Sequence, residues 1–280
     1  MNEVVYTPES LVLRPRRLLA EMVEDLMAAR HLAWRLMWRD IRVQYRRSLL
    51  GASWTFIPAM ATAALLTLAN RARIITVSET AVPYAAYVVL GMTLWQTFLD
   101  ALNGPVTALA AEKNLLAKFN VAPEAIILSK LGEALFNFAV RSVLSAALFV
   151  WYGVAVGPTL LLAPLGVAAL VILGASMGLF LAPFSALYQD VPKSLPIVTS
   201  FWFFLTPIVY PAPAHGLLAL IVRWNPVTPL LVTTRELVTG HPLSAATGFA
   251  TTSLLALCLL LVGWLIYRVS MPIVLERARY

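Results

Sequence analysis

The sequence is poor in charged side chains and in cysteine. Only 12% of its 280 residues are charged, against about 25% in ordinary soluble domains, whereas 60% are hydrophobic. The single cysteine, Cys258, has no partner for a disulfide and so gives no evidence about the redox compartment. With a mean hydropathy of +0.79, this composition excludes an ordinary soluble domain and predicts an all-α polytopic membrane protein.

Motifs for nucleotide binding and metal catalysis are also missing. The chain has no GxxxxGK[ST] phosphate loop, so we expect it not to bind ATP in that way. It has no HExxH or CxxC motif, and His31, His215 and His241 lie in different regions. We therefore predict no catalytic residue, no metal site and no cofactor in this chain.

Basic residues are concentrated beside the apolar runs. Lys and Arg number 21 against 14 Asp and Glu, which gives a net charge of +7. If both termini lie in the cytoplasm, sixteen of these cations fall on the inner side, four on the outer side, and Arg141 within a span. This bias follows the positive-inside rule. The excess charge is therefore assigned to orientation and to contact with anionic membrane lipids, and no nucleic-acid partner is expected.

Apolar runs that could cross a bilayer follow one another after residue 51. The six predicted transmembrane helices are residues 52–70, 83–103, 124–152, 159–184, 195–210 and 246–267. They form a transmembrane domain, 52–270, between a cytoplasmic N-terminal segment, 1–51, and a cytoplasmic tail, 271–280. The fifth run is short for a span and is allowed to begin as early as Pro192.

The segment 211–242, between the fifth and sixth spans, is moderately apolar but broken by prolines. It predicts two short helices, 216–224 and 228–238, that enter the membrane from outside and return. A seventh full crossing is the alternative.

The stretch from Arg30 to Pro58 predicts an amphipathic helix that leads into the first span. On a helix of 3.6 residues per turn, basic side chains share one face and apolar ones the opposite face. The basic face is Arg35, Arg39, Arg42 and Arg46, and the apolar face is Trp34, Met37, Trp38, Ile41 and Tyr45. The pattern is typical of a helix in the membrane interface, with its apolar side about 5–10 Å towards the acyl chains and its arginines at lipid phosphates. A helix packed on a soluble core, with solvated arginines, is the alternative.

Polar residues inside the third span share one helix face. Glu133, Asn137 and Arg141 recur every four residues, and Lys130 lies one turn before Glu133. Ionisable groups at such depth face a bundle interior or a wet path. Two interpretations stay open: a translocation path, or a network that holds helices together. Asp100 is interpreted as a boundary group near the cytoplasmic end of the second span.

The inner loop, 104–123, predicts a short helix over residues 108–119. Its apolar positions are Leu109, Leu115, Leu116 and Phe119, beside Glu112, Lys113 and Lys118. A short mixed helix in a cytoplasmic loop suits docking to a cytoplasmic partner.

Four segments carry a family resemblance. They are RDIRVQYRRSLLGASWTFIPA (39–59), NLLAKFNVAP (114–123), YQDVPKSLPIVTSFWFFLTPIVYP (188–211) and RWNPVTPLL (223–231). In order and spacing they resemble the permease subunits of type 2 ABC exporters for polysaccharides. Two places depart from the family: Val121 and Ala122 precede Pro123, where an aromatic residue is frequent, and Gln189 precedes Asp190, where the family has arginine.

The resemblance implies a half-transporter in the bacterial inner membrane that forms a homodimer and recruits two cytoplasmic ABC ATPase subunits. The ATPase would bind ATP and Mg²⁺, so this chain would be a permease and not an enzyme. The implied substrates are lipid-linked polysaccharides such as O antigen, capsule and teichoic acid, and the segment after Tyr210 would form outer gate helices. The residues that would couple the permease to the ATPase are Glu112, Asn114, Leu115, Leu116, Lys118, Phe119 and Asp190.

Two sets of residues are predicted to contact the substrate. The guanidinium group of arginine can donate two parallel hydrogen bonds to phosphate oxygens. The arginines expected to attract the anionic headgroup are Arg39, Arg42, Arg46 and Arg47. Aromatic faces suit a sliding sugar chain, and the predicted translocation path is Tyr84, Tyr87, Trp95, Phe98, Glu133, Asn137, Arg141, Phe201, Trp202, Phe203 and Phe204. Anchoring to anionic lipids is the alternative for the arginines, and interface anchoring or lipid contact is the alternative for the aromatic residues.

Two other functions are weighed against this one. The first is a type 2 ABC permease for a drug or a small lipid. The second is an ion-coupled secondary carrier that uses Glu133 and Arg141. Such carriers often contain repeated halves, and no repeat relates residues 52–152 to residues 159–267.

Overall fold

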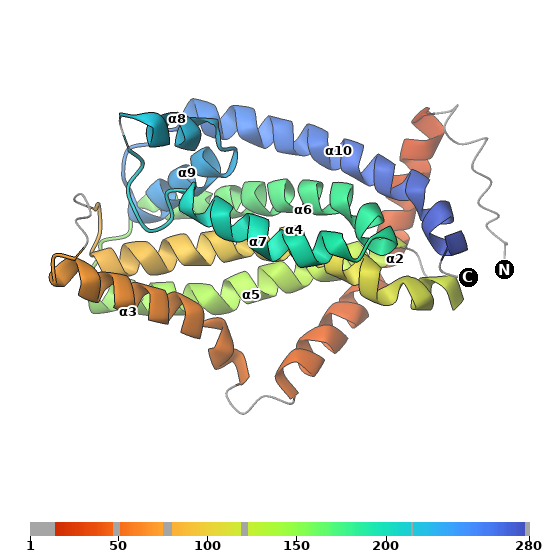
Figure 1. Ribbon diagram of the computed structural model, residues 1–280, viewed down its shortest axis with the longest axis horizontal. Helices are drawn as coiled ribbons and strands as arrows, with labels where there is room; N and C mark the ends of the chain where they lie inside the picture. Colours follow the sequence, from red (N-terminus) through yellow and green to blue (C-terminus); the bar gives the residue numbers. More distant parts are fainter. Residues whose placement is uncertain (1–14, 47–50, 75–79, 119–122, 214, 278–280) are drawn as a thin grey trace.

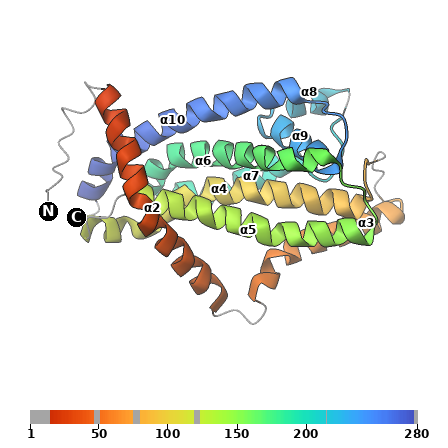
Figure 2. The same cartoon turned by 180° about the vertical axis from the view of Figure 1, so that it is seen from behind.

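The computed structural model describes residues 15–46, 51–74, 80–118, 123–213 and 215–277. The regular elements in these ranges are the helices α2 (Pro15–Arg46), α3 (Ile57–Arg71), α4 (Tyr84–Lys118), α5 (Pro123–Trp151), α6 (Ala163–Leu187), α7 (Asp190–Phe204), α8 (Leu217–Trp224), α9 (Val227–Thr239) and α10 (Ala246–Arg277), and the 3-10 helices η1 (Gly51–Thr55) and η2 (Pro158–Leu162). All are helical, which confirms the all-α prediction. The long helices lie side by side in the order α10, α6, α4, α5 (Figures 1 and 2).

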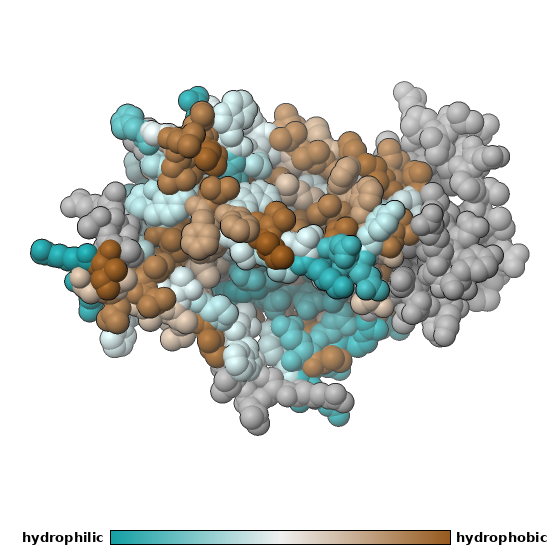
Figure 3. Space-filling view, in the orientation of Figure 1, coloured by the Kyte–Doolittle hydropathy of each residue, from teal (hydrophilic) through white to brown (hydrophobic). Residues whose placement is uncertain are grey.

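Within the described ranges, four helical segments are long and apolar enough to cross a membrane: Tyr84–Leu109, Glu124–Trp151, Pro158–Leu187 and Ala246–Met271. They correspond to the predicted second, third, fourth and sixth spans. Apolar side chains cover much of the face in Figure 3, and most of the α10 span is exposed. This surface is suited to lipid contact, because most of its large exposed side chains are apolar.

The first and fifth predicted spans are shorter. α3 and α7 have 15 residues each, which is about 22 Å of helix against a hydrocarbon core of about 30 Å. α7 begins at Asp190, earlier than expected, and ends at Phe204, because Pro207 disfavours helical backbone at the residue before it. η1 lengthens α3 at its N-terminal end. The six-span count stays a prediction for α3 and α7.

α4 and α6 approach closely at two glycines. A Cβ atom at Gly174 would lie 2.5 Å from the carbonyl oxygen of Phe98, and one at Gly178 would lie 2.5 Å from that of Leu102. Only hydrogen fits at either position. This is the small-xxx-small contact by which membrane helices pack, and it places α4 and α6 at the centre of the bundle.

The run Gly174–Gly178 also has the GxSxG spacing of a hydrolase nucleophile elbow. That elbow is a strand-to-helix turn that exposes its serine. Ser176 instead lies inside α6, is buried, and donates a hydrogen bond to the carbonyl oxygen of Leu173 at 2.7 Å. The motif in this chain is a packing feature.

α2 crosses the bundle near the last turns of α10 and then extends away from it (Figures 1 and 2). Its buried positions Ala29, Ala33, Met37 and Ile41 recur every four residues, and this face packs on α5. The amphipathic helix is thus present, and α5 covers Met37 and Ile41 of its apolar face. Its depth in the membrane stays a prediction. Trp34, assigned to that face, is exposed.

An ion-pair cluster joins α2 to α5 and α10. Arg268 of α10 lies 2.6 Å from Asp25 of α2 and 3.2 Å from Glu124 of α5. One mostly buried guanidinium therefore joins three helices, and its loss would leave two carboxylates facing each other.

α8 and α9 are the two short helices predicted between the fifth and sixth spans, and their axes meet at 85°. Asn225 forms the corner: its Oδ1 accepts hydrogen bonds from Trp202 Nε1 and from the backbone N–H of Val227, both at 3.0 Å. Its Nδ2 donates to Thr206 Oγ1 at 2.8 Å. One buried amide thus orients the bend against α7, while the re-entrant path through the membrane stays a prediction.

Candidate functional site

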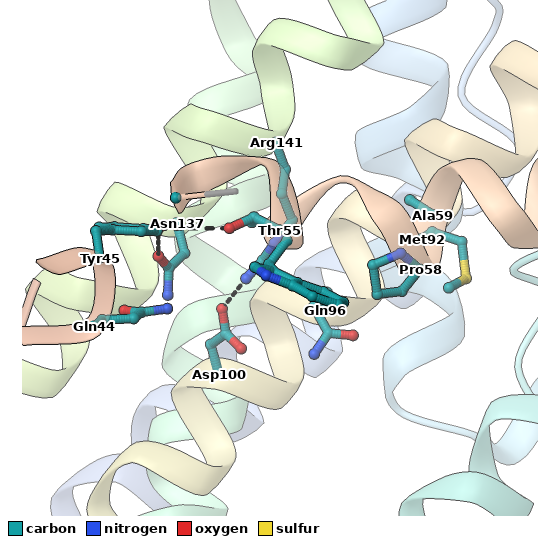
Figure 4. A pocket seen from close by; sticks show the side chains of 12 residues that line it. Gln44, Tyr45, Thr55, Pro58, Ala59, Met92, Gln96, Asp100, Asn137 and Arg141 are labelled. Atoms are coloured by element: carbon teal, nitrogen blue, oxygen red, sulfur yellow. Dashed lines mark hydrogen bonds and ion pairs between the residues drawn. The ribbon is translucent and has the colours of Figure 1, made fainter. Parts of the chain in front are cut away.

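A polar cavity of about 440 Å³ lies at the elbow between α2 and α3 (Figure 4). The end of α2, η1 and the start of α3 form one wall, and α4 and α5 form the other. The polar residues of the lining are Gln44, Tyr45, Thr55, Gln96, Asp100, Asn137 and Arg141. Segments far apart in sequence therefore bring amides, hydroxyls, a carboxylate and a guanidinium to one place.

An ion pair between Arg141 and Asp100 lies across the cavity wall from α5 to α4 (Figure 4). The Arg141 side chain is only 7% exposed, and no described residue hydrogen-bonds to its Nη1. The Tyr45 hydroxyl donates to Asn137 Oδ1 at 3.4 Å and lies 3.5 Å from Thr55 Oγ1. These contacts hold the end of α2 and η1 against α5.

The cavity lies at mid-depth of the helices that form it. Gln96 is near the centre of the span Tyr84–Leu109, and Asn137 is near the centre of Glu124–Trp151. Charged groups at such depth are costly and are tolerated where they pair with one another or face water. The Asp100–Arg141 pair meets the first condition, and the cavity supplies the second.

The predicted polar face of the third span is divided between two places. Asn137 and Arg141 line the cavity, whereas Glu133 accepts a hydrogen bond from Lys130 at 2.8 Å. Lys130 also donates to Asp40 of α2 at 2.9 Å. Glu133 therefore belongs to a cluster that fixes α2 on α5, which fits the network interpretation, while Asn137 and Arg141 face open space.

The same cluster sets the charge of Asp40. Burial by itself raises the pKa of this carboxyl, but the hydrogen bonds and positive charges of Lys130 and Arg39 outweigh burial. The pKa of Asp40 consequently lies below its ordinary value of 3.8. Asp40 is thus an anion at neutral pH and holds the Arg39 guanidinium, whose Nε donates to it at 2.8 Å.

Asp100 is not the boundary group that the sequence suggested. The dipeptide Gly104-Pro105 has the composition of a helix end, but Pro105 is accommodated inside α4, which continues well beyond it. Asp100 therefore lies in the helix interior, opposite Arg141. Sequence reasoning also missed Gln96, although its spacing of four from Asp100 places both on one helix face.

The basic face of α2 lines a second hollow, a surface groove of about 480 Å³. Its lining is Trp34, Arg35, Trp38, Arg39, Arg42, Val43 and Arg46. Arg42 and Arg46 are exposed. Arg47, the fourth predicted headgroup residue, lies outside the described residues. The structure thus gathers the predicted arginines on one surface with two tryptophans beside them.

Groove and cavity share the last turn of α2. Arg42 and Arg46 belong to the groove, and Gln44 and Tyr45 belong to the cavity. A strongly cationic surface and a polar cavity whose charges are paired therefore meet on adjacent faces of this turn.

Comparison with known proteins identifies the family to which a chain with this arrangement belongs. The family model of the ABC-2 type transporters matches residues 31–239, from the basic face of α2 to the end of α9. The chain belongs to the ABC-2 type transporter family. Such a protein is the membrane subunit of a transporter, and this permease is a multi-pass protein of the inner membrane. The O-antigen export system permease protein RfbA of Myxococcus xanthus is 25% identical to it over 233 residues, 80% of this chain and 86% of that protein.

The aromatic residues predicted for the path of the permease fall into two groups. Trp95 and Phe98 are 2% and 0% exposed and meet the partly buried Trp202 edge-on. They lie in the core because α4 is surrounded by α5, α6 and α7, and this placement argues against a lining role. Phe201 and Phe204 of α7 are 70% and 68% exposed, so they are the predicted path residues that the chain presents on its surface.

Tyr84 and Tyr87 hold the chain that follows α7. The Tyr84 hydroxyl donates to the carbonyl oxygen of Val209 at 3.0 Å, and that of Tyr87 donates to the carbonyl oxygen of Tyr210 at 3.1 Å. Both tyrosines therefore have a structural contact at one end of α4, and the lining role stays a prediction for them.

Arg235 of α9 reinforces this attachment. Its guanidinium lies over the ring of Tyr87, with Cζ 3.8 Å from the ring centre. It donates to the carbonyl oxygens of Pro207 at 3.2 Å and Ile208 at 2.8 Å. The bent pair α8–α9 and the segment after α7 are thereby joined to α4 through one buried cation.

The predicted coupling helix is not a separate element. Residues 108–118 are the last part of α4, so the helix expected in the inner loop continues the second span. Phe119, the last predicted coupling residue of this segment, lies outside the described residues. Asp190, the other predicted contact, is exposed at the first position of α7.

Proposed function

We propose that this ABC-2 permease is the membrane half of an ATP-driven exporter of lipid-linked polysaccharide. It works as a homodimer with two separate cytoplasmic ATPase subunits, which bind ATP and Mg²⁺, and both of its termini lie in the cytoplasm. The likeness to an O-antigen export permease supports the substrate class. The observation that carries the proposal is the arginine groove of α2 beside a polar cavity within the membrane-spanning helices.

The groove binds the anionic headgroup of the carrier lipid. Arg42 and Arg46 are exposed and free of carboxylate partners among the described residues, whereas Arg39 is held by Asp40. Guanidinium groups form paired, charge-assisted hydrogen bonds with phosphate oxygens. Trp34 and Trp38 border the same groove, and indole rings are favoured at the headgroup level of a bilayer. A lipid phosphate is therefore the ligand that this surface fits best.

The glycan passes between two copies of the permease. Sugars present apolar C–H faces, and exposed aromatic rings give such faces a contact without tight capture. Phe201 and Phe204 on α7 supply these rings. The polar cavity supplies hydrogen bonds at mid-depth.

The ATPase acts on the permease through the end of α4 and through Asp190. Residues 108–118 continue α4 without a break, so a push on them moves the whole helix. Gln96 and Asp100 lie on that helix and line the cavity. A movement of the motor subunit is thus transmitted to the cavity wall by a rigid element.

The test is charge reversal in the groove. Arg42→Glu combined with Arg46→Glu is expected to lower surface glycan about tenfold or more, because each charge-assisted hydrogen bond contributes about 1.5–3 kcal/mol. Stimulation of the ATPase by lipid-linked glycan should fall with it, while basal hydrolysis persists. The matched control is Arg71→Glu, an exposed arginine at the far end of α3.

Three outcomes would contradict parts of this proposal. Normal export by the double variant would show that the headgroup binds elsewhere. Absence of any ATPase subunit from the purified complex would favour an ion-coupled carrier. If cells lacking the permease accumulate no glycan, its substrate is a drug or a small lipid.

A further inference from the structure

The cavity at the α2–α3 elbow differs in charge from the groove next to it. Among the described lining residues the one cation, Arg141, is paired with Asp100, and the other polar groups are neutral amides and hydroxyls. A phosphate in this cavity would meet the Asp100 carboxylate without an unpaired positive charge to offset the repulsion. The cavity is therefore suited to a neutral polar ligand, and the groove to an anion.

One hydrogen-bond donor of the cavity wall, at mid-depth of the helices, has no partner among the described residues. Arg141 is more than nine-tenths buried, and its Nη1 has no partner among the described residues. A buried donor without a partner is costly. Arg141 lines the cavity, and a small shift of its side chain towards a ligand oxygen would remove that cost. Gln96 and Asn137 contribute amides to the same wall, and Asp100 contributes carboxylate oxygens. Donors and acceptors are thus mixed within one cavity.

This mixture matches a sugar ring. Each sugar hydroxyl is both a donor and an acceptor, and neighbouring hydroxyls can engage a carboxylate, an amide and a guanidinium together. The rings of Tyr45 and Trp54 also line the cavity and offer flat faces to the C–H side of a sugar. Its volume of about 440 Å³ lies within the range of about 300–1,000 Å³ found for small-molecule sites.

We propose that the elbow cavity binds the first, uncharged sugar of the exported glycan while the groove holds the adjoining phosphate. This inference rests on the proposed function, because it takes the groove ligand to be a lipid phosphate. The shared last turn of α2 sets the spacing: Arg46 lies on the groove and its neighbour Tyr45 on the cavity. The permease thereby recognises the junction between lipid and glycan, and it distinguishes a loaded carrier lipid from an empty one.

The test compares two probes on the full-length permease in nanodiscs of phosphatidylcholine, which carries no net charge. One probe is undecaprenyl diphosphate, and the other is the same lipid with a single N-acetylglucosamine. The native protein is expected to bind the sugar-bearing lipid about tenfold more tightly, the gain of one or two good hydrogen bonds. Gln96→Met, similar in shape but unable to form those bonds, should lose this preference and keep its affinity for the sugar-free lipid.

The controls separate a sugar site from a general defect. Gln189→Met changes an exposed glutamine outside the cavity and should keep the tenfold preference. Gln44→Met, at an exposed position of the cavity rim, repeats the test where folding is not at risk and should weaken the preference. Arg42→Glu should weaken the binding of both lipids alike.

The failures of the two proposals are distinguishable. Equal affinity of the native protein for both lipids, or an undiminished preference in both Gln96→Met and Gln44→Met, would overturn the sugar site and leave the headgroup site standing. Binding of neither lipid would overturn the proposed function, and the sugar site with it.

Discussion

At the level of single residues, Arg235 fixes one end of the permease. Its buried guanidinium donates to the carbonyl oxygens of Pro207 and Ile208 and covers the ring of Tyr87. Arg235→Met would leave both carbonyl groups unpaired, and we expect it to lower the free energy of unfolding by about 3 kcal/mol. The measurement is the Tm in detergent, with Arg223→Met at an exposed position of α8 as a control that shifts it little. An unchanged Tm for Arg235→Met would contradict this role.

Asp40 gives the joint between α2 and α5 a dependence on pH. Its pKa is lowered in the folded chain because Lys130 and Arg39 outweigh the effect of burial. A lowered pKa means that the stabilisation is present above the ordinary value of 3.8 and is lost as the pH falls through the folded value. The difference in Tm between the native protein and Asp40→Asn should therefore be constant from neutral pH to about pH 5 and shrink below about pH 4. Glu24→Gln, at an exposed position of α2, should show no such acid-dependent difference.

At the level of helices, the contact between α4 and α6 depends on backbone approach, which a pair of matched substitutions can test. Gly174→Ala would place Cβ 2.5 Å from the carbonyl oxygen of Phe98, whereas at Gly132 the nearest atom, at 2.6 Å, is the flexible Met37 sulfur. A backbone carbonyl group in a packed helix cannot move away from the added Cβ atom, whereas the end of a methionine side chain can. We expect Gly174→Ala to cost about 1–3 kcal/mol of stability and Gly132→Ala clearly less, measured as the shift in Tm. Equal shifts would show that α4 and α6 are not in rigid contact.

The helices could be predicted from the sequence where the apolar runs were long. The position of individual side chains in the bundle could not be predicted in this way. The spans that became α5 and α10 follow directly from hydropathy, and the corner at Asn225 lies between the two short helices that prolines had delimited. Trp95 and Phe98 were misassigned because aromatic residues suit a core as well as a path, and periodicity does not say which neighbours surround a helix. Asp100 was misassigned because Pro105, which resembles a helix end, lies more than three turns before the end of α4.

The cavity could be predicted only in part, for a related reason. Asn137 and Arg141 share a face by helical spacing, which marked α5 as a polar wall. The opposite wall comes from Gln96 and Asp100 on another helix, and the rim comes from the end of α2. Bringing these together requires the order of helices in the bundle, which one sequence does not contain.

At the level of the whole molecule, positive charge is distributed unequally between the two ends of the bundle. α2, which crosses one end of the bundle (Figure 1), carries the exposed arginines Arg30, Arg35, Arg42 and Arg46. At the opposite end α3 finishes at Arg71, which is exposed. By the positive-inside rule we predict that the end with the arginines of α2 faces the cytoplasm.

That orientation has a direct test with single cysteines. In a Cys258→Ser background, a membrane-impermeant maleimide applied to intact spheroplasts is expected to label Arg71→Cys and not Arg30→Cys, both at exposed positions. Permeabilised membranes should label both equally, which controls for reactivity. Labelling of both sites, or of neither, on intact spheroplasts would mean that Ile57–Arg71 does not cross the membrane, since the two positions would then share one side. Labelling of Arg30→Cys alone would place the arginine groove outside, where neither a cytoplasmic carrier lipid nor an ATPase could reach it.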